Sequence, residues 1–245
     1  MKLCKTATGR GDVISFQGAF HGCGHTAMTL TGLVEQKQPI ANRVPGIHFF
    51  PYSACGSCPL GLTPTAAPST APPTWRTPST TPTAASPARG RDHGVGAGRG
   101  RRGARAPGVR PPGPRTHPRA GHPLIVDEVQ TGCGRTGTWF AFEQYGIEPD
   151  VIVASKALSG IGTPVALILY DESLDVWAPG AHTGTFRGNQ LAFAAGVETV
   201  DIIRRDRVLE NVRRRGTQLA ERFAVLDSHP WVHEARGMGL MWVWR

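Results

Sequence analysis

Two residues that could carry chemistry lie at the ends of apolar runs. Asp127 lies at the end of residues 124–128 (LIVDE), and Lys156 at the end of residues 150–156 (DVIVASK). Such runs are typical of buried parallel strands, whose carboxyl ends meet at the edge of a sheet where ligands bind. An acid and an amine there could form a salt bridge at the rim. Alternatively, Lys156 could form a Schiff base with a cofactor that Asp127 tunes, and these residues alone leave both interpretations open.

A possible metal site is a second chemical signal. Cys55 and Cys58 form a CxxC pair, which can supply half of a zinc site or a redox dithiol. No second pair follows at metal-ligand spacing, and His48 and the other cysteines do not complete a recognisable ligand set. We therefore interpret the pair as loop cysteines and expect no metal.

The formal charge of +9 could indicate a nucleic-acid partner, so its position along the chain matters. Nine arginines and one acid, Asp92, lie between residues 88 and 119, and the rest of the chain is close to neutral. A basic tract without interleaved aromatic residues can bind phosphate backbones only nonspecifically. We expect no specific nucleic-acid partner, and nonspecific binding through this tract is an alternative function.

Other global features bear on the compartment. The chain has five cysteines, an odd number, with no signal peptide and no long apolar run. These features are typical of a reducing cytoplasm, and we expect a cytoplasmic protein that is neither secreted nor membrane-spanning.

A low-complexity segment interrupts the chain at residues 64–123. Its only large apolar side chains are Trp75, Val95 and Val109, so it cannot bury enough surface to offset its ordering entropy. We expect it to be disordered. Its Ala, Pro, Gly and Arg usage is also what GC-rich coding sequence gives when read out of phase, which suggests two compensating frame errors.

The rest of the chain alternates strand and helix signals, which predicts an α/β architecture with a mostly parallel sheet. Residues 189–226 show apolar residues at three- and four-residue spacing and are expected to form two helices. A helix closed by Gly9 is expected at the start. The expected strands are 12–16, 124–128, 150–156, 164–170 and 237–244, and shorter helices are expected at 26–31 and 140–145.

Four strings in order along the chain resemble class III aminotransferases, which are fold-type I enzymes that use pyridoxal 5′-phosphate. They are FQGAFHG (16–22), LIVDEVQTGCGRTG (124–137), SKALSG (155–160) and HTGTFRGNQLAFAAG (182–196). The resemblance implies transamination between a small amino acid and a keto acid, in a homodimer. Within the family, residues 175–196 are most similar to members that act on 2,4-diaminobutyrate, or a similar omega-amino donor, and 2-oxoglutarate.

The resemblance implies catalytic roles for the two residues at the strand ends. Lys156 matches the Schiff-base lysine, which also moves the proton between substrate and cofactor. Asp127 matches the carboxylate that pairs with the pyridine nitrogen and keeps the ring protonated.

Further matched residues imply contacts with the cofactor. Phe20 matches the aromatic residue that stacks on the ring, and His21 shapes its loop. Val129 matches the residue on the opposite ring face, and Gln130 the one near the phenolic oxygen. Thr185 matches the threonine that reaches the phosphate from the neighbouring subunit. We interpret His182 and Asn189 as a loop and a capping residue.

The sequence also departs from the family pattern. The Ser-Gly loop that binds the phosphate is missing ahead of the first helix, and residues 64–123 replace a central strand, so we expect poor folding. The substrate-carboxylate arginine of the small domain has no match in Arg236 or Arg245. A catalytically inactive fragment is therefore an alternative function.

These observations divide the chain into four parts, with a large domain that is incomplete. We assign 1–63 to the first part of the cofactor-binding large domain, 64–123 to the low-complexity segment, 124–200 to the large domain with its lysine, and 201–245 to connector helices and the start of a truncated C-terminal small domain.

Overall fold

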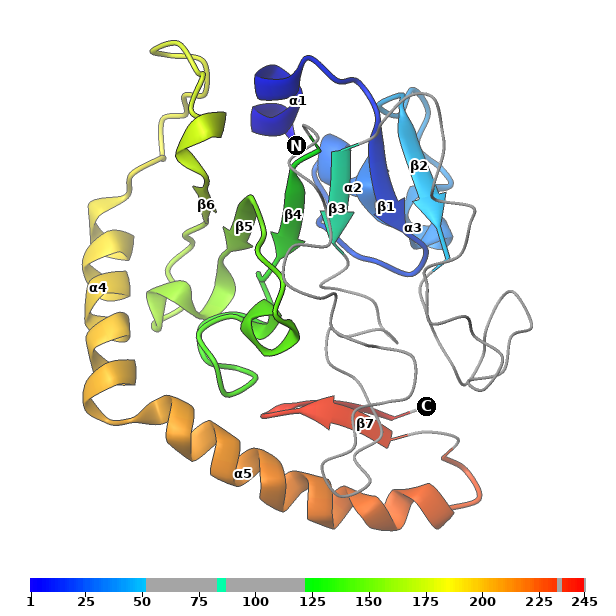
Figure 1. Ribbon diagram of the computed structural model, residues 1–245, viewed down its shortest axis with the longest axis vertical. Coiled ribbons are helices and arrows are strands. Elements are labelled where there is room, and N and C mark those ends of the chain that lie inside the picture. Colours follow the sequence, from blue (N-terminus) through cyan, green and yellow to red (C-terminus); the bar gives the residue numbers. More distant parts are fainter. Residues whose placement is uncertain (52–82, 87–121, 233–234, 245) are drawn as a thin grey trace.

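A computed structural model describes residues 1–51, 83–86, 122–232 and 235–244 (Figure 1). The CxxC pair, the basic tract and most of the 64–123 segment lie outside the described residues, so the expectations for them stay predictions. No helix in the described part of the chain has both the length and the apolar composition needed to cross a bilayer.

A six-stranded sheet forms the centre of the molecule, in the order β2-β1-β3-β4-β5-β6. All neighbours pair in parallel except β5 and β6, which are antiparallel. The predicted α/β architecture with a mostly parallel sheet is confirmed. The strands are β1 (Val13–Phe16), β2 (Ile47–Phe50), β3 (Thr83–Ser86), β4 (Leu124–Asp127), β5 (Val151–Ala154) and β6 (Leu167–Tyr170).

Strand β3 corrects an expectation. It lies within the low-complexity segment, yet it pairs with β1 through Thr83 and Ala84 and with β4 through Ala84, Ala85 and Ser86. The prediction that a central strand is missing is therefore wrong for these four residues. Backbone donors and acceptors make the ladder, so its formation does not require an apolar sequence pattern.

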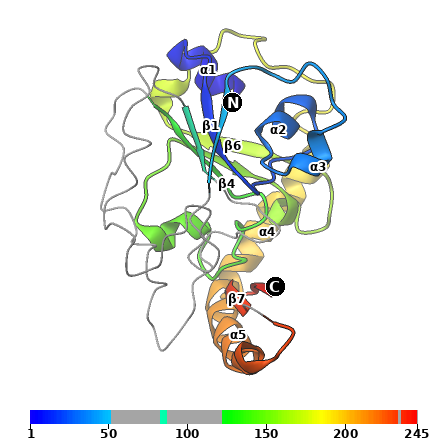
Figure 2. The ribbon, with the colours of Figure 1, turned by 90° about the vertical axis from the view of Figure 1, so that its right-hand side faces the viewer.

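The core lies where the sheet meets helix α1 (Lys2–Thr8). The buried cluster joins Leu3 and Cys4 of α1 to Ile125 of β4 and Val151 of β5, with Leu174 beside them. Helix α1 ends at Gly9 in the left-handed conformation, as predicted. Figure 2 shows α2 (His25–Leu30) and α3 (Val34–Lys37) together on one face of the sheet.

The predicted pair of helices in residues 189–226 is confirmed as α4 (Gln190–Arg205) and α5 (Val208–Phe223). The side chain of Asn189 caps α4 by accepting the N–H groups of Leu191 at 3.0 Å and Ala192 at 3.2 Å, as the capping interpretation predicts. Helix α4 packs against the segment that follows β5, and α5 passes below the carboxyl ends of the strands (Figure 1). Short 3-10 helices complete the fold: η3 (Ala141–Tyr145), η4 (Lys156–Ser159), η5 (Glu172–Leu174) and η6 (Ala224–Ser228).

The expected strand at 237–244 is wrong in one respect, because the segment is a hairpin. Strand β7 (Ala235–Met238) pairs antiparallel with β8 (Met241–Trp244). Gly239 has a φ of 57°, which is the left-handed conformation a tight two-residue turn requires and glycine adopts readily. The hairpin lies between α5 and the sheet (Figure 1).

Candidate active site

Asp127 pairs with His21 at the carboxyl edge of the sheet. His21 Nδ1 lies 2.9 Å from Asp127 Oδ2, and only 8% and 10% of the two side chains are exposed. The other carboxylate oxygen of Asp127 accepts the N–H of Val129 at 3.1 Å. The backbone N–H of His21 donates to Thr31 Oγ1 at 3.0 Å, which fixes the loop after β1. The carboxylate is thus oriented by two donors within a nearly dry environment.

The second ring nitrogen of His21 is buried as well. Among the described residues, Nε2 has no hydrogen-bond partner. Because Nδ1 faces a carboxylate oxygen, which can only accept, Nδ1 is the nitrogen that donates to Asp127. His21 therefore orients the Asp127 carboxylate, a role that the sequence did not predict.

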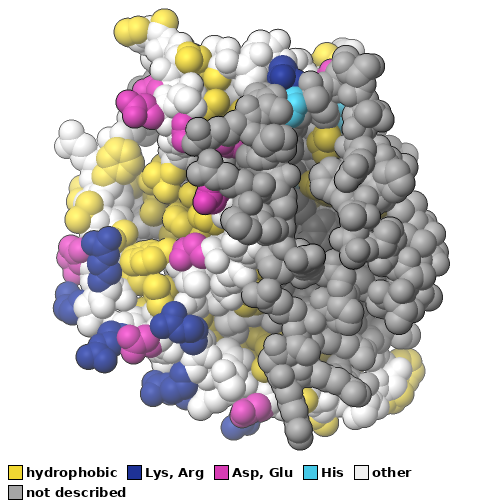
Figure 3. All heavy atoms as spheres, viewed as in Figure 1, with side chains coloured by type: hydrophobic (Ala, Val, Ile, Leu, Met, Phe, Trp, Pro, Cys, Tyr) yellow, Lys and Arg dark blue, Asp and Glu magenta, His cyan; other side chains and the backbone are white. Residues whose placement is uncertain are grey.

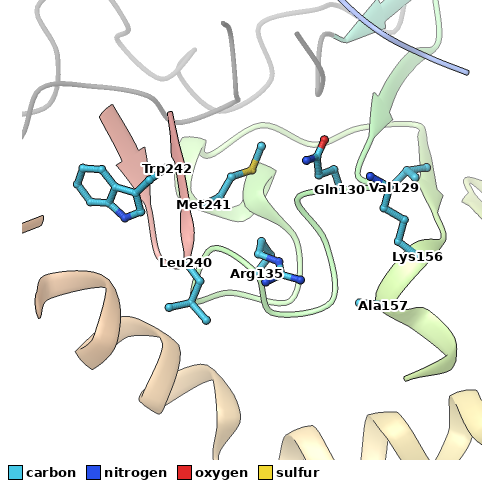
Figure 4. Close-up of a pocket in the computed structure, with 8 residues that line it drawn as sticks. All are labelled: Val129, Gln130, Arg135, Lys156, Ala157, Leu240, Met241 and Trp242. Carbon is cyan, nitrogen blue, oxygen red and sulfur yellow. The ribbon is translucent and has the colours of Figure 1, made fainter. Parts of the chain in front are cut away.

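Lys156 begins η4 immediately after β5. Its φ of 49° is uncommon for a residue other than glycine and is the kind of local strain that is found at functional sites. The side chain of Ser155 donates to the carbonyl of Val165 at 2.6 Å, which holds the turn ahead of it. The exposed Lys156 side chain lies along a pocket of about 310 Å³ (Figure 4).

Three segments build the walls of this pocket. The loop after β4 supplies Val129, Gln130 and Arg135, and η4 supplies Lys156 and Ala157. The β7–β8 hairpin supplies a third wall of large apolar side chains, formed by Leu240, Met241 and Trp242. The volume is at the lower end of the range for small-molecule sites.

The hairpin is held at the pocket by close backbone contacts. Leu240 N–H donates to the carbonyl of Arg135 at 3.0 Å. A Cβ at Gly239 would lie 2.7 Å from backbone atoms of Arg135 and Thr136, and a Cβ at Gly216 of α5 would lie 2.8 Å from Gly239 Cα. The absence of side chains at both glycines therefore allows α5, the hairpin and the loop after β4 to meet.

Glu128 anchors the loop that carries three of the pocket residues. It is buried, with 2% of its surface exposed, and accepts a hydrogen bond from the Thr131 hydroxyl and another from Phe142 N–H at 2.9 Å. Burial raises the pKa of Glu128, and the hydrogen bonds from Thr131 and from the backbone of Phe142 and Ala141 oppose that rise. This carboxylate joins the start of the loop to η3.

The structure brings together most of the predicted site residues. Lys156, Val129 and Gln130 share the pocket, and Asp127 is joined to it through Val129. Phe20 is half-buried next to His21 and is not part of the pocket lining. The sequence reasoning missed the remaining lining residues, Arg135, Ala157 and the hairpin, although Arg135 stands in the Gly-rich stretch GCGRTG that follows a strand.

Thr185 lies elsewhere. It is exposed in the segment between η5 and α4, which follows β6. Because β6 is antiparallel to β5, this segment starts at the edge of the sheet opposite Lys156. Figure 1 shows the segment first rising away from the loops after β4 and β5 and then descending to the start of α4.

The residues at the carboxyl edge fit pyridoxal 5′-phosphate. A carboxylate has about four acceptor positions. His21 and Val129 use two of those of Asp127, which leaves room for a protonated ring nitrogen. The Lys156 side chain lies along an open pocket, and Lys156 and Asp127 lie at the carboxyl ends of two neighbouring parallel strands. No cluster in the described part of the chain has three or more side chains suited to a metal ion.

Comparison with known proteins decides the family. A model of the family described as "Aminotransferase class-III" matches residues 118–245, slightly more than half of the chain. The chain belongs to the class III aminotransferases. The resemblance seen in the four strings and the fold-type I architecture of the large domain are both confirmed.

Two individual relatives match nearly the whole of this class III chain. It is 43% identical over 257 aligned positions to diaminobutyrate–2-oxoglutarate aminotransferase of Rhizobium meliloti (strain 1021), covering 98% of this chain and 52% of that protein. It is 37% identical to the enzyme of the same name from Haemophilus influenzae, covering 98% and 53%. The chain therefore spans about half the length of these curated relatives.

A solved structure supports the fold. The omega-transaminase of Thermomicrobium roseum superposes with a TM-score of 0.78 at 24% identity, covering 99% of this chain and 56% of that one. At this identity the likeness concerns the fold alone.

Proposed function

We propose that this class III aminotransferase transfers an amino group between 2,4-diaminobutyrate, or a similar omega-amino donor, and 2-oxoglutarate. The observation that carries the proposal is the juxtaposition of Lys156 with the buried Asp127–His21 pair at one edge of the sheet. The names of the relatives support the choice of substrates.

The cofactor would be pyridoxal 5′-phosphate, which when bound supplies an electron sink for the electrons left on the substrate carbon. Asp127 would hold the ring nitrogen in its protonated form. His21 Nδ1–H would keep the Asp127 carboxylate oriented. Because both side chains are nearly buried, water would compete little for either hydrogen bond.

Lys156 would carry the proton. Its Nζ would take a proton from the substrate carbon that bears the amino group and deliver it to the cofactor carbon that carried the aldehyde during the same half-reaction. Val129, Gln130 and Phe20 would position the ring: Val129 on one face, Phe20 on the other, and Gln130 at the phenolic oxygen. The amino donor would leave as an aldehyde, and 2-oxoglutarate would leave as glutamate.

We further propose that the active form is a homodimer. Thr185 is exposed and does not line the pocket of its own chain, and the family resemblance assigns it to the phosphate of the neighbouring subunit, a contact that would require a second copy. Apolar side chains gather on the surface over β6 and α4 (Figure 3), among them Leu169, Leu191, Phe193 and Val197. Exposed patches of this kind are common at protein interfaces. We place the reaction in the cytoplasm, on the cysteine usage.

Product formation tests the proposal. The chain is incubated with pyridoxal 5′-phosphate, 2,4-diaminobutyrate and 2-oxoglutarate, and glutamate is measured by mass spectrometry. Lys156→Ala should abolish glutamate formation, whereas Lys5→Ala, in α1 at the other end of the sheet, should retain it. No glutamate from the unmodified chain would favour the inactive fragment. Equal glutamate from Lys156→Ala would refute the role of the lysine.

A further inference from the structure

The loop after β1, which carries Phe20 and His21, is fastened to the segment that ends α2. The N–H of His21 donates to Thr31 Oγ1 at 3.0 Å, and the N–H of Gly32 donates to the carbonyl of Ala19 at 2.7 Å. A Cβ at Gly32 would overlap a backbone oxygen at the end of β1, so the two segments lie in direct backbone contact. The position of the loop therefore depends on where the end of α2 is held.

Two side chains hold the end of α2. Ser15 of β1 donates its hydroxyl to the carbonyl of Leu30 at 2.6 Å, and Lys37 of α3 donates its Nζ to the carbonyl of Thr31 at 2.7 Å. Carbonyls at the C-terminal end of a helix have no donor within the helix, so side chains must supply one. The ammonium of Lys37 is the charged donor of the two, and hydrogen bonds from a charged donor are the stronger kind.

Stability alone does not explain a buried ammonium at this place. Only 6% of Lys37 is exposed, and its Nζ lies 3.7 Å from the centroid of the Phe49 ring of β2. No salt bridge in the described part of the chain includes Lys37, and lysines are rarely buried without a charged partner. Burial lowers the pKa of Lys37, and the nearby charge of Arg43 lowers it further. A methionine would fill the same space without burying a charge, so the particular contribution of the ammonium is its hydrogen bond to Thr31.

We infer that Lys37 is a positioning residue of the proposed pyridoxal 5′-phosphate site. Its Nζ holds the Thr31 carbonyl, the Thr31 hydroxyl holds the backbone of His21, and the His21 ring holds the Asp127 carboxylate at 2.9 Å. Lys37 does not line the pocket, so it acts through these contacts. The inference rests on the proposed function, because the orientation of Asp127 matters to catalysis only if the cofactor binds there.

Hydrogen exchange of the full chain without cofactor, followed by NMR, measures the first consequence. Lys37→Met keeps an unbranched side chain but removes the donor, so the His21 amide should exchange roughly tenfold faster than in the unmodified chain. The Glu128 amide, which donates to β5 at 2.9 Å, should keep its rate. Lys5→Met, in α1, is the matched control and should change neither amide.

Absorbance titration with pyridoxal 5′-phosphate measures the second consequence. Lys37→Met should lower the cofactor affinity about tenfold, because part of the binding energy must then order the loop. Thr31→Val should lower it as well, whereas Thr31→Ser keeps the hydroxyl that His21 N–H contacts and should retain the affinity. In urea unfolding, Lys37→Met should be no less stable than the unmodified chain, because it no longer buries a cation.

Three results would overturn the inference: an unchanged exchange rate of the His21 amide in Lys37→Met, an equal acceleration of the Glu128 amide, or a Lys37→Met chain that does not fold. The last two would make Lys37 a general support of the fold. Borohydride trapping of the cofactor on Lys156 separates these failures from failure of the proposed function. Trapping in the unmodified chain together with any of the three results contradicts the role of Lys37 alone. Absence of trapping contradicts the proposed function, and the exchange rates, measured without cofactor, still decide whether Lys37 fixes His21.

Discussion

Gly239→Ala should detach the hairpin from the pocket. An alanine at this position must adopt a φ of 57°, which costs about 1–2 kcal/mol for a residue with a Cβ. Its Cβ would also lie 2.7 Å from backbone atoms of Arg135 and Thr136, and backbone cannot move aside as a flexible side chain can. Overpacking of this kind costs about 1–3 kcal/mol. The two effects together give a loss of about 2–5 kcal/mol in the free energy of unfolding.

Gly146→Ala is the matched control for backbone strain. Gly146 has a φ of 62°, almost that of Gly239, but nothing lies within 4 Å of the position its Cβ would take. This variant should lose only the conformational cost, about 1–2 kcal/mol. The difference between the two variants therefore isolates the contact between the hairpin and the loop after β4.

Urea unfolding of both variants, followed by circular dichroism, gives the two free energies. Hydrogen exchange gives a local readout, because the Leu240 amide donates to Arg135 and should exchange faster in Gly239→Ala than in Gly146→Ala. Equal destabilisation of the two variants, with unchanged protection of the Leu240 amide, would show that the hairpin does not dock at this loop.

Substitutions at three further positions test other contacts of the site and its supports. His21→Ala should destabilise the fold by about 1–3 kcal/mol in urea unfolding, because it removes a donor from the buried Asp127 carboxylate; a loss below about 0.5 kcal/mol would argue against the pair. Glu128 has a raised pKa, so its protonated form is favoured in the folded state, and the stability it contributes is present below about pH 4.3 and lost as pH rises through the raised pKa. As the pH rises from 4 to 8, the free energy of unfolding of Glu128→Gln should therefore increase relative to that of the unmodified chain. A difference between the two free energies that stays constant across that range would contradict the burial of the carboxyl group. Asn189→Ala should cost about 1 kcal/mol through loss of the α4 cap, and Asn189→Gly only a few tenths; equal losses would mean that the side-chain cap contributes nothing.

The sequence predicted the parts of the fold that depend on local pattern. Residues 124–128 and 150–156 read as buried strands because their apolar runs are continuous, and both end at the expected edge of the sheet. The cap at Asn189 and the left-handed Gly9 also follow from residue type at a helix end. These features need no knowledge of distant neighbours.

The features that the sequence did not predict depend on distant neighbours. Strand β3 has no apolar pattern, and its position follows from the edges that β1 and β4 offer. His21 and Asp127 are 106 residues apart, so no spacing rule could pair them. The hairpin wall of the pocket depends on Gly239 turning the chain, in a run whose composition alone resembles one strand.

The central claim is that Lys156, supported by the Asp127–His21 pair, forms a site for pyridoxal 5′-phosphate. The most direct measurement is borohydride reduction of the chain in the presence of the cofactor, followed by peptide mass spectrometry. We expect the label on Lys156, no label in Lys156→Ala, and a retained label in Lys5→Ala. A label spread over several surface lysines and unaffected by Lys156→Ala, or no label at all, would contradict it.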